Sequence, residues 1–196
     1  MIAGVTDRQG HAVPITFVGM PGSGKSTVGR HVARHLGLPF IDTDHLIEQR
    51  IGCSIRDYFE VQGEPAFRDV EQAVIDEVTQ LPGHVVATGG GAVLREANRH
   101  ALHSRTTVVY LRSTPEDLAR RLRHDSHRPL LQQGGADPLR RLRSLFQERD
   151  PLYRHTAHFI VETGRPSVHT LVNMVLMQLE LAGVVPTSGA TENPHP

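Results

Sequence analysis

The stretch GMPGSGKST, residues 19–27, decides the fold of this chain. It fits the pattern G-x-x-x-x-G-K-[ST], with Gly19, Gly24, Lys25 and Ser26 at the fixed places. A glycine loop of this kind cradles nucleotide phosphates with consecutive backbone N–H groups, because glycine permits the turn and the close approach. Lys25 is expected to reach the β- and γ-phosphates and Ser26 to coordinate magnesium. The pattern therefore predicts a site for ATP and Mg²⁺.

The basic residues support this prediction. Lys25 is the only lysine among the 21 lysines and arginines of the chain. A lysine in a phosphate loop is a compact point charge on a flexible stem, which an arginine fork cannot copy.

Length and composition favour one globular domain. The chain has 196 residues, and its 21 basic and 21 acidic side chains balance, so we expect no nucleic-acid partner. No apolar run is long enough for a membrane helix, so we expect no membrane contact. The single cysteine, Cys53, and the absence of a signal-like N-terminus favour the cytoplasm. We also expect a monomer, because no exposed apolar helix face stands out.

Strand-like and helix-like segments alternate along the chain, which predicts a parallel sheet with helices on both faces. The expected strands are 13–19, 38–44, 84–91, 106–111 and 157–162. The expected helices are 25–36, 44–51, 55–62, 64–81, 95–103, 115–123 and 138–154, and a last one that opens at Pro166 and ends at Gly183. Ligands of such sheets bind beyond the carboxyl ends of the strands. We therefore expect the glycine loop, Asp42, Asp44 and the Gly89–Gly91 run to converge on one cleft.

Residues 124–137, HDSHRPLLQQGGAD, are polar, contain glycine and show no periodicity, which predicts a mobile lid. Arginines in and before this segment, among them Arg121 and Arg128, could fold over ATP and stabilise charge on the transferring phosphate. The alternative is that they are solvated surface side chains. Residues 1–13 and 184–196 are expected to be flexible tails of a domain that spans 14–182.

The sequence IDTD places two aspartates at the end of the second strand. In an extended chain Asp42 and Asp44 project to the same side. One could steady magnesium and the other could orient a hydroxyl or accept its proton. The alternative makes Asp44 a simple N-cap for the next helix. Since no aspartate ends the third strand, Asp42 has to serve as the acidic partner of the phosphate loop.

Three further motifs are candidate ligand contacts, each with a plain structural alternative. In FRDVE, Arg68 and Glu71 lie one helical turn apart, either as a surface pair or with Glu71 holding Arg68 to grip a carboxylate. TGGG, residues 88–91, offers N–H groups without side chains, or else is only a flexible corner. ERDPLY, residues 148–153, adds Arg149.

In their order and number, these pieces resemble the shikimate kinase family over about residues 14–182. The matching motifs are G-x-x-G-x-G-K-S-T, D-T-D, F-R-x-x-E, T-G-G-G, R-P-L-L and R-x-P-L-Y. The glycine loop alone is shared by many ATPases, whereas the full ordered set is specific. The resemblance implies a single-domain α/β P-loop kinase with a five-stranded parallel sheet in the order 2-3-1-4-5. It also implies transfer of the γ-phosphate of ATP to the 3-hydroxyl of shikimate, on the route to chorismate and the aromatic amino acids.

At the substrate end, the resemblance implies that Asp44 binds the hydroxyls of shikimate and acts as the general base. Arg68 and Arg149 bind its carboxylate. The pocket is lined by Gly89, Gly90 and Gly91, with Gly90 as the direct contact.

At the nucleotide end, the resemblance gives Lys25 and Arg128 catalytic roles, and it stacks Arg121 on the adenine. Ser26 and Asp42 serve the metal. The residues implied in ATP binding are Gly22, Ser23, Gly24, Lys25, Ser26, Thr27, Arg121, Arg128, Arg165 and Pro166.

Two other hypotheses remain open at this stage. A related small-molecule kinase, for gluconate or a nucleoside monophosphate, would share the phosphate loop and lid but would not need both FRxxE and RxPLY. A nucleotide-binding regulatory protein without catalysis would tolerate the loss of Asp44.

Overall fold

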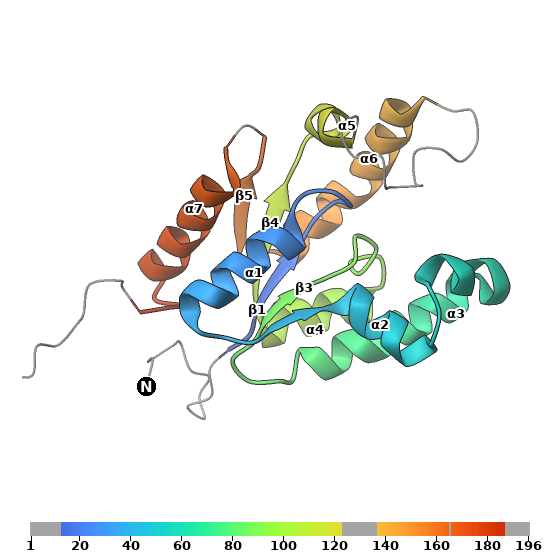
Figure 1. The fold of residues 1–196 in the computed structure, drawn as a ribbon, viewed down its shortest axis with the longest axis horizontal. Helices are drawn as coiled ribbons and strands as arrows, with labels where there is room; N and C mark the ends of the chain where they lie inside the picture. The colour runs from blue at the N-terminus through green and yellow to red at the C-terminus, as the bar shows by residue number, and fades with distance from the viewer. Residues whose placement is uncertain (1–12, 123–136, 165, 187–196) are drawn as a thin grey trace, which may run out of the picture.

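A computed structural model describes residues 13–122, 137–164 and 166–186 (Figure 1). Five parallel strands form one sheet in the order β2-β3-β1-β4-β5, which confirms the predicted fold and strand order. The strands are β1 (Ile15–Val18), β2 (Phe40–Asp42), β3 (Val85–Ala87), β4 (Thr107–Arg112) and β5 (Phe159–Glu162).

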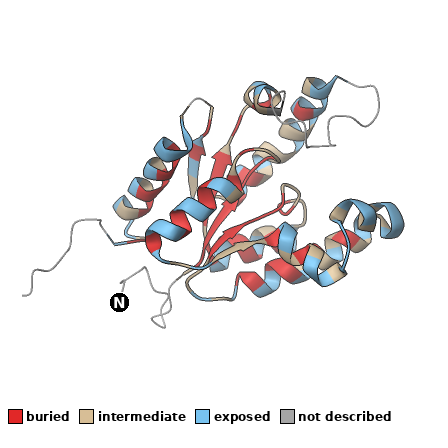
Figure 2. Cartoon of the chain, in the orientation of Figure 1, coloured by how far each residue is buried: buried red, intermediate tan, exposed pale blue. Residues whose placement is uncertain are grey.

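Helices cover both faces of this sheet (Figure 1). They are α1 (Lys25–Leu36), α2 (Thr43–Ile51), α3 (Ile55–Val78), α4 (Glu96–Arg105), α5 (Pro115–Leu122), α6 (Pro138–Thr156) and α7 (Val168–Leu181). α1 and α7 pack on one face, and α3, α4 and α6 pack on the other. Figure 2 shows the inner strands β3, β1 and β4 as a mostly buried layer between them, whereas the edge strands β2 and β5 are more exposed.

The central strand β1 explains why the sheet needs both layers. Ile15 and Phe17 contribute to the core under α1 and α7, while Val18 contributes to the core on the opposite side. Because consecutive side chains of a strand point to opposite faces, a strand that is apolar at nearly every position must be covered twice. The phosphate loop therefore leaves a strand that is buried at every position.

The helix boundaries differ from the predicted ones where backbone capping decides them. The predicted break between two helices is present at Gly63, whose φ of 82° is positive and whose backbone is not helical, so α3 consists of two helical parts joined by a kink. Ser54 caps the start of α3 by accepting from the N–H of Asp57. The last helix does not open at Pro166: it begins at Val168, because Ser167 is the N-cap and accepts from the N–H of Thr170.

The predicted lid, except for Asp137, lies outside the described residues, as do residues 1–12 and 187–196 of the predicted tails. The first residues of the predicted C-terminal tail are packed: Val185 is 7% exposed in the core under α1 and α7, and Val184 packs against that core. Asp137 is the N-cap of α6 and accepts from the N–H of Leu139 at 3.1 Å. Among the described helices, none is long and apolar enough to cross a membrane.

A pair of stacked histidines joins the edge strand β5 to the sheet. The N–H of His158 donates to the carbonyl of Val108, and the N–H of Val108 donates back to Nδ1 of His158 at 2.9 Å. The His158 ring stacks on the ring of His103, with centroids 4.4 Å apart. Burial, and then the neighbouring His103, lower the pKa of His158. The neutral ring is therefore the form that the folded chain prefers.

This arrangement predicts a loss of stability in mild acid. Because the folded pKa of His158 is lowered, the unfolded chain binds the proton first as the pH falls below about 6.5, and stability is lost from there downward. Replacing His158→Asn keeps an acceptor for Val108 and removes the titration. We expect the drop in Tm between pH 7.5 and pH 5.5 to be smaller in this variant than in the wild type. His35→Asn, at an exposed position on α1, is the control and should leave the drop unchanged.

Candidate active site

The phosphate loop connects β1 to α1 with the geometry that the motif requires. Gly24 is the N-cap of α1 with a φ of 94° and makes no side-chain cap, so the first N–H groups of the helix are left for a ligand. At Gly19, an added Cβ would lie 2.6 Å from the carbonyl oxygen of Leu111. The loop thus fits against β4 only with glycine at this position.

The side chain of Lys25 folds back over the phosphate loop. Its Nζ donates to the carbonyls of Gly19 and Met20, both at 2.9 Å, and the residue is only 7% exposed. Its predicted neighbours in ATP binding are close by: Gly22 has a left-handed φ, Ser23 is buried, and Thr27 is exposed in the first turn of α1.

Asp42 joins the phosphate loop to the second strand. Its Oδ2 accepts from the Ser26 hydroxyl at 2.6 Å, and its Oδ1 accepts from the backbone N–H groups of Asp44 and His45. Asp42, and not Asp44, is therefore the N-cap of α2, so the capping alternative for Asp44 was wrong. The expectation that the two aspartates project together from an extended chain was also wrong, because α2 already begins at Thr43.

The pair of Ser26 and Asp42 suits a magnesium ion. Mg²⁺ prefers hard oxygen ligands and commonly uses one or two protein oxygens with phosphate oxygens and waters. Over the described ranges, no group of three or more histidine, cysteine, aspartate or glutamate side chains could hold a metal ion. The two oxygens of Ser26 and Asp42 would leave the other positions around such an ion to phosphate oxygens and waters.

Asp44 lies at the opening of the cleft, with its carboxylate against the glycine turn. A Cβ added to Gly89 would lie 2.6 Å from Oδ1 of Asp44. Asp44 is exposed to the solvent of the cleft, yet the surrounding protein atoms still remove part of its hydration. This burial, and then the charge of Asp42, raise the pKa of Asp44 to about 6, although Lys25 opposes the shift. Asp44 can therefore exchange a proton close to neutral pH.

The glycine turn, Gly89 to Gly91, is the point where three parts of the site meet. A Cβ on Gly90 would lie 2.7 Å from Cδ of Pro21 in the phosphate loop, and one on Gly91 would lie 2.6 Å from Nη2 of Arg68. None of the three has a positive φ. They are glycines because neighbours occupy the space of a side chain, and not because of an unusual backbone.

Arg68 and Glu71 form a buried ion pair on α3. Nη1 of Arg68 donates to Oε2 of Glu71 at 2.6 Å, and the two side chains are 12% and 2% exposed. The alternative of a surface pair was therefore wrong. Burial raises the pKa of Glu71, and the charges of Arg68, Arg149 and Arg95 oppose this rise. Glu71 thus holds Arg68 on its buried side, and the guanidinium of Arg68 lies against Gly91 of the glycine turn.

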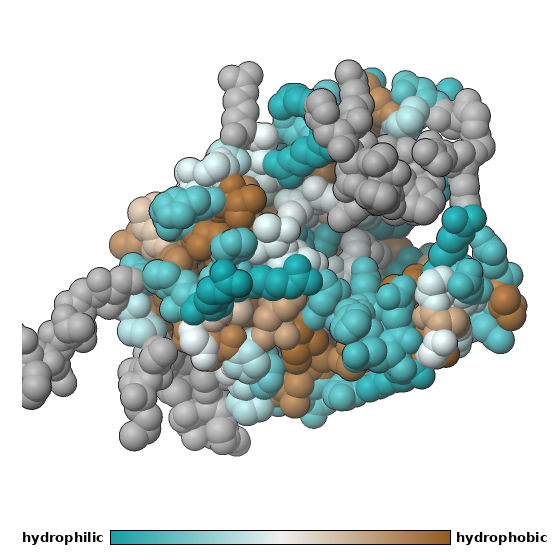
Figure 3. Space-filling view, viewed as in Figure 1, coloured by the Kyte–Doolittle hydropathy of each residue, from teal (hydrophilic) through white to brown (hydrophobic). Residues whose placement is uncertain are grey.

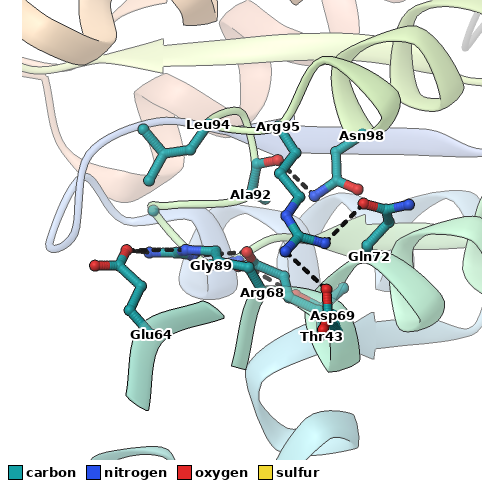
Figure 4. A network of polar contacts seen from close by, with 12 residues as sticks. Thr43, Glu64, Arg68, Asp69, Gln72, Gly89, Ala92, Leu94, Arg95 and Asn98 are labelled. Carbon is teal, nitrogen blue, oxygen red and sulfur yellow. Dashed lines mark hydrogen bonds and ion pairs between the residues drawn. The ribbon is translucent and has the colours of Figure 1, made fainter. Parts of the chain in front are cut away.

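Arg95 holds the same segment of α3 from the other side. It forms an ion pair with Asp69 at 2.8 Å and donates to Oε1 of Gln72 at 3.0 Å (Figure 4). Asn98 donates to the carbonyl of Ala92 in the same close-up. These contacts tie the start of α4 to the helix that carries Arg68.

Arg149 reaches the site from α6, where a tyrosine links it to the glycine turn. The Tyr153 hydroxyl donates to the carbonyl of Gly90 at 2.5 Å. Burial raises the pKa of Tyr153, and the nearby Arg149 opposes the rise. The ring of Tyr110 packs against that of Tyr153, with centroids 4.9 Å apart.

Asp150, next to Arg149, anchors α6 to the sheet. It accepts from the Tyr110 hydroxyl at 2.8 Å, from Nε of Arg112 at 3.1 Å and from Nε of Arg154 at 2.7 Å. Burial alone would raise the pKa of Asp150, but these three hydrogen bonds outweigh it and leave the pKa lowered.

Arg121 lies on the nucleotide side. Its guanidinium donates to the carbonyl of Ser23 at 3.5 Å, to the hydroxyl of Ser113 at 3.4 Å and to the carbonyl of Thr163. Pro166 is half-buried just before α7, whereas Arg128 and Arg165 lie outside the described residues. Arg121 thus stands between the phosphate loop and the end of β5, where the adenine was predicted.

The predicted convergence on one cleft is present, at the carboxyl ends of the strands. In the space-filling view the surface is hollowed between α3 and the α5–α6 pair (Figure 3). The sequence analysis missed three residues that build this site. Thr43 accepts from the N–H of Gly89, Pro21 fills the space beside Gly90, and Tyr153 binds the carbonyl of Gly90. Each belongs to a quoted motif, so the motifs contained the signal, although their chemistry did not reveal the contacts.

Comparison with known proteins agrees with this geometry. The family model for shikimate kinase matches residues 21–180. The chain belongs to the shikimate kinase family. A shikimate kinase of Paracidovorax citrulli is 57% identical over 183 residues, covering 92% of this chain and 99% of the relative. One from Burkholderia thailandensis is 58% identical over 173 residues, or 88% of this chain and 93% of the relative.

Solved structures lead to the same family. A shikimate kinase from Acinetobacter baumannii, in complex with shikimate, is 44% identical, with a TM-score of 0.80 and coverage of 87% of this chain and 93% of that one. A gluconokinase from Sinorhizobium meliloti is 20% identical, with a TM-score of 0.53 and coverage of 88% and 94%. The likeness to the gluconokinase shows the fold alone.

The anchoring of α6 gives a first prediction on the site. Replacing Asp150→Ala leaves the Tyr110 hydroxyl and Nε of Arg112 without their acceptor, although Nη1 of Arg112 keeps Glu162. We therefore expect a loss of about 1–3 kcal/mol in the free energy of unfolding. Tyr110→Phe removes one donor and leaves both arginine contacts, so its loss should be smaller. Urea denaturation monitored by circular dichroism measures both. Equal stabilities of Asp150→Ala and the wild type would show that Asp150 is not an anchor.

Proposed function

We propose that the chain transfers the γ-phosphate of ATP to the 3-hydroxyl of shikimate, giving ADP and shikimate 3-phosphate for the synthesis of chorismate and aromatic amino acids. The observation that carries this proposal is the buried pair of Arg68 and Glu71. It lies beside the glycine turn, where Oε1 of Glu71 and Oδ1 of Asp44 both approach Gly89. A kinase for an uncharged acceptor has no need of a braced arginine at this position.

The substrate end of the site suits a small ring with one carboxylate and several hydroxyls. Arg68, with Arg149 facing it from α6, would clamp the acid, because a guanidinium fork matches a carboxylate. Gly89, Gly90 and Gly91 would leave room for the ring. Fixing the acid end determines which hydroxyl faces the γ-phosphate, and such positioning supplies much of the catalysis in phosphoryl transfer.

Asp44 would act as the general base at the reacting hydroxyl. A bond forms between the 3-hydroxyl oxygen and the γ-phosphorus while the bond from that phosphorus to the bridging oxygen of ADP breaks. The hydroxyl proton passes to the carboxylate of Asp44, and the electron pair of the broken bond stays on ADP. A carboxylate with a pKa of about 6 is a stronger base than an ordinary one and is still mostly ionised at neutral pH.

The nucleotide end would use the phosphate loop. The N–H groups of Gly22, Ser23, Gly24 and the first turn of α1 would receive the phosphates, and Lys25 would exchange its loop carbonyls for phosphate oxygens. Ser26 and Asp42 would hold Mg²⁺, which when bound neutralises charge on the phosphates. Arg121 would cover the adenine together with Arg165 and Pro166. Arg128 keeps its predicted role over the γ-phosphate.

The remaining expectations belong to the same proposal. We expect no nucleic-acid or membrane partner, a monomer, and a place in the cytoplasm. The alternative is a related small-molecule kinase of the gluconate or nucleotide type. Such a kinase would share the phosphate loop and lid but would not need both FRxxE and RxPLY, which this chain carries.

A coupled assay of ADP release tests the reaction directly. With ATP and Mg²⁺ present, we expect shikimate to stimulate release, gluconate and AMP to have little effect, and the removal of Mg²⁺ to abolish the response. Stimulation by gluconate instead of shikimate would support the alternative. If no acceptor stimulates release while ATP still binds, the kinase proposal fails.

The role of Asp44 predicts a pH profile. Since the raised pKa of Asp44 is about 6, the ionised base is lost below that value, so kcat/KM for shikimate should fall about tenfold per pH unit there. Asp44→Asn should keep ATP binding and lose roughly 10²- to 10⁴-fold in kcat. Steady-state rates from pH 5 to pH 8 and ATP titrations measure both. Wild-type turnover in Asp44→Asn would rule out the base assignment.

A further inference from the structure

The fork of Arg68 already holds two carboxylates in the structure. Nη1 of Arg68 donates to Oε2 of Glu71 at 2.6 Å. Nε and Nη2 of Arg68 both donate to Oε1 of Glu64, at 3.1 Å and 2.9 Å. Figure 4 shows the fork of Arg68 directed at Glu64. Both glutamates belong to α3, four residues before and three residues after the arginine.

The two glutamates differ in how firmly they are held. Glu71 is 2% exposed, packed on the side where Arg149 and Arg95 also add positive charge. Glu64 is 57% exposed and lies on the solvent side of Arg68. It directly follows Gly63, where α3 is kinked. Glu64 can therefore turn into water at little cost, whereas Glu71 cannot leave without exposing an unpaired buried charge.

A substrate carboxylate needs the donors that Glu64 occupies. Nη1 is committed to the buried Glu71, so Nε and Nη2 are the pair that remains for a two-pronged contact. If Glu64 stayed in place, three carboxylates would surround one guanidinium. Like charges at such distances repel, so the bound acid and Glu64 exclude each other.

We propose that Glu64 is an internal stand-in for the substrate carboxylate, and that it determines the affinity and selectivity of the Arg68 site. In the empty site Glu64 holds the fork in its binding orientation and competes with other small anions. An incoming acid displaces it, and only a ligand that also contacts the rest of the pocket gains enough to do so. The apparent affinity for the acid is the intrinsic affinity multiplied by the fraction of molecules in which Glu64 has left the Arg68 guanidinium. Glu64 therefore weakens binding of the acid. This inference rests on the proposed function.

Replacing Glu64→Gln tests the displacement. The amide keeps the size and a hydrogen-bond acceptor but removes the charge, so the Kd and KM for shikimate should fall together, by roughly three- to tenfold. We expect kcat to change less than KM. Isothermal titration calorimetry gives Kd, and the ADP-release assay gives the kinetic constants. A raised Kd would mean that Glu64 only positions Arg68, and an unchanged Kd would mean that it does not compete; either result overturns the proposal.

A matched control and a second ligand sharpen the test. Glu60→Gln removes the carboxylate from another exposed i,i+4 pair of α3, with Arg56 at 3.1 Å, and should leave the Kd unchanged. Shikimamide, the uncharged amide of shikimate, should gain less from Glu64→Gln than the acid does. If Glu64→Gln tightens binding of shikimate and of shikimamide equally, the proposal that the carboxylate of the ligand replaces that of Glu64 is wrong.

The wild type separates this inference from the proposed function. If the wild type shows no shikimate-dependent turnover and binds no shikimate, the proposed function fails and the inference fails with it. If the wild type turns over shikimate while Glu64→Gln does not bind it more tightly, the inference alone fails.

Discussion

The site depends on a steric constraint in the glycine turn between β3 and α4. Pro21, Asp44 and Arg68 each approach one glycine so closely that a Cβ there would collide with them. A side chain at any of the three positions would push apart the phosphate loop, Asp44 and Arg68. The turn thus sets the distances among these three parts of the site, and the sheet below supplies the rigid support.

Patterning predicted the alternation of strands and helices, and the family resemblance supplied the strand order. Motifs with strict residue requirements mark the strand ends, so the convergence of these ends on one cleft was also predicted. The sequence predicted less well where the outcome depends on contacts between distant segments. The Tyr153 hydroxyl reaches Gly90 across 63 positions of the chain, and Asp42 reaches Ser26 across 16. The second contact also explains the wrong alternative for Asp44, because spacing alone cannot decide which of two aspartates begins a helix.

Charges of opposite sign lie side by side in the cleft. Lys25 adds positive charge near Asp44, and Arg68 and Arg149 add positive charge near Glu71. Two of the basic groups have oxygen partners within the protein: loop carbonyls for Lys25 and two carboxylates for Arg68. At these two positions, ligand binding would exchange partners instead of creating them.

The solitary lysine has a practical consequence for the whole molecule. An endoprotease specific for lysine has one cleavable bond in this chain, between Lys25 and Ser26, at the start of α1. That bond is protected while the lysine is tucked against the carbonyls of Gly19 and Met20. Cleavage into two fragments therefore reports the opening of the phosphate loop, and its slowing by a nucleotide measures occupancy of the loop without any label.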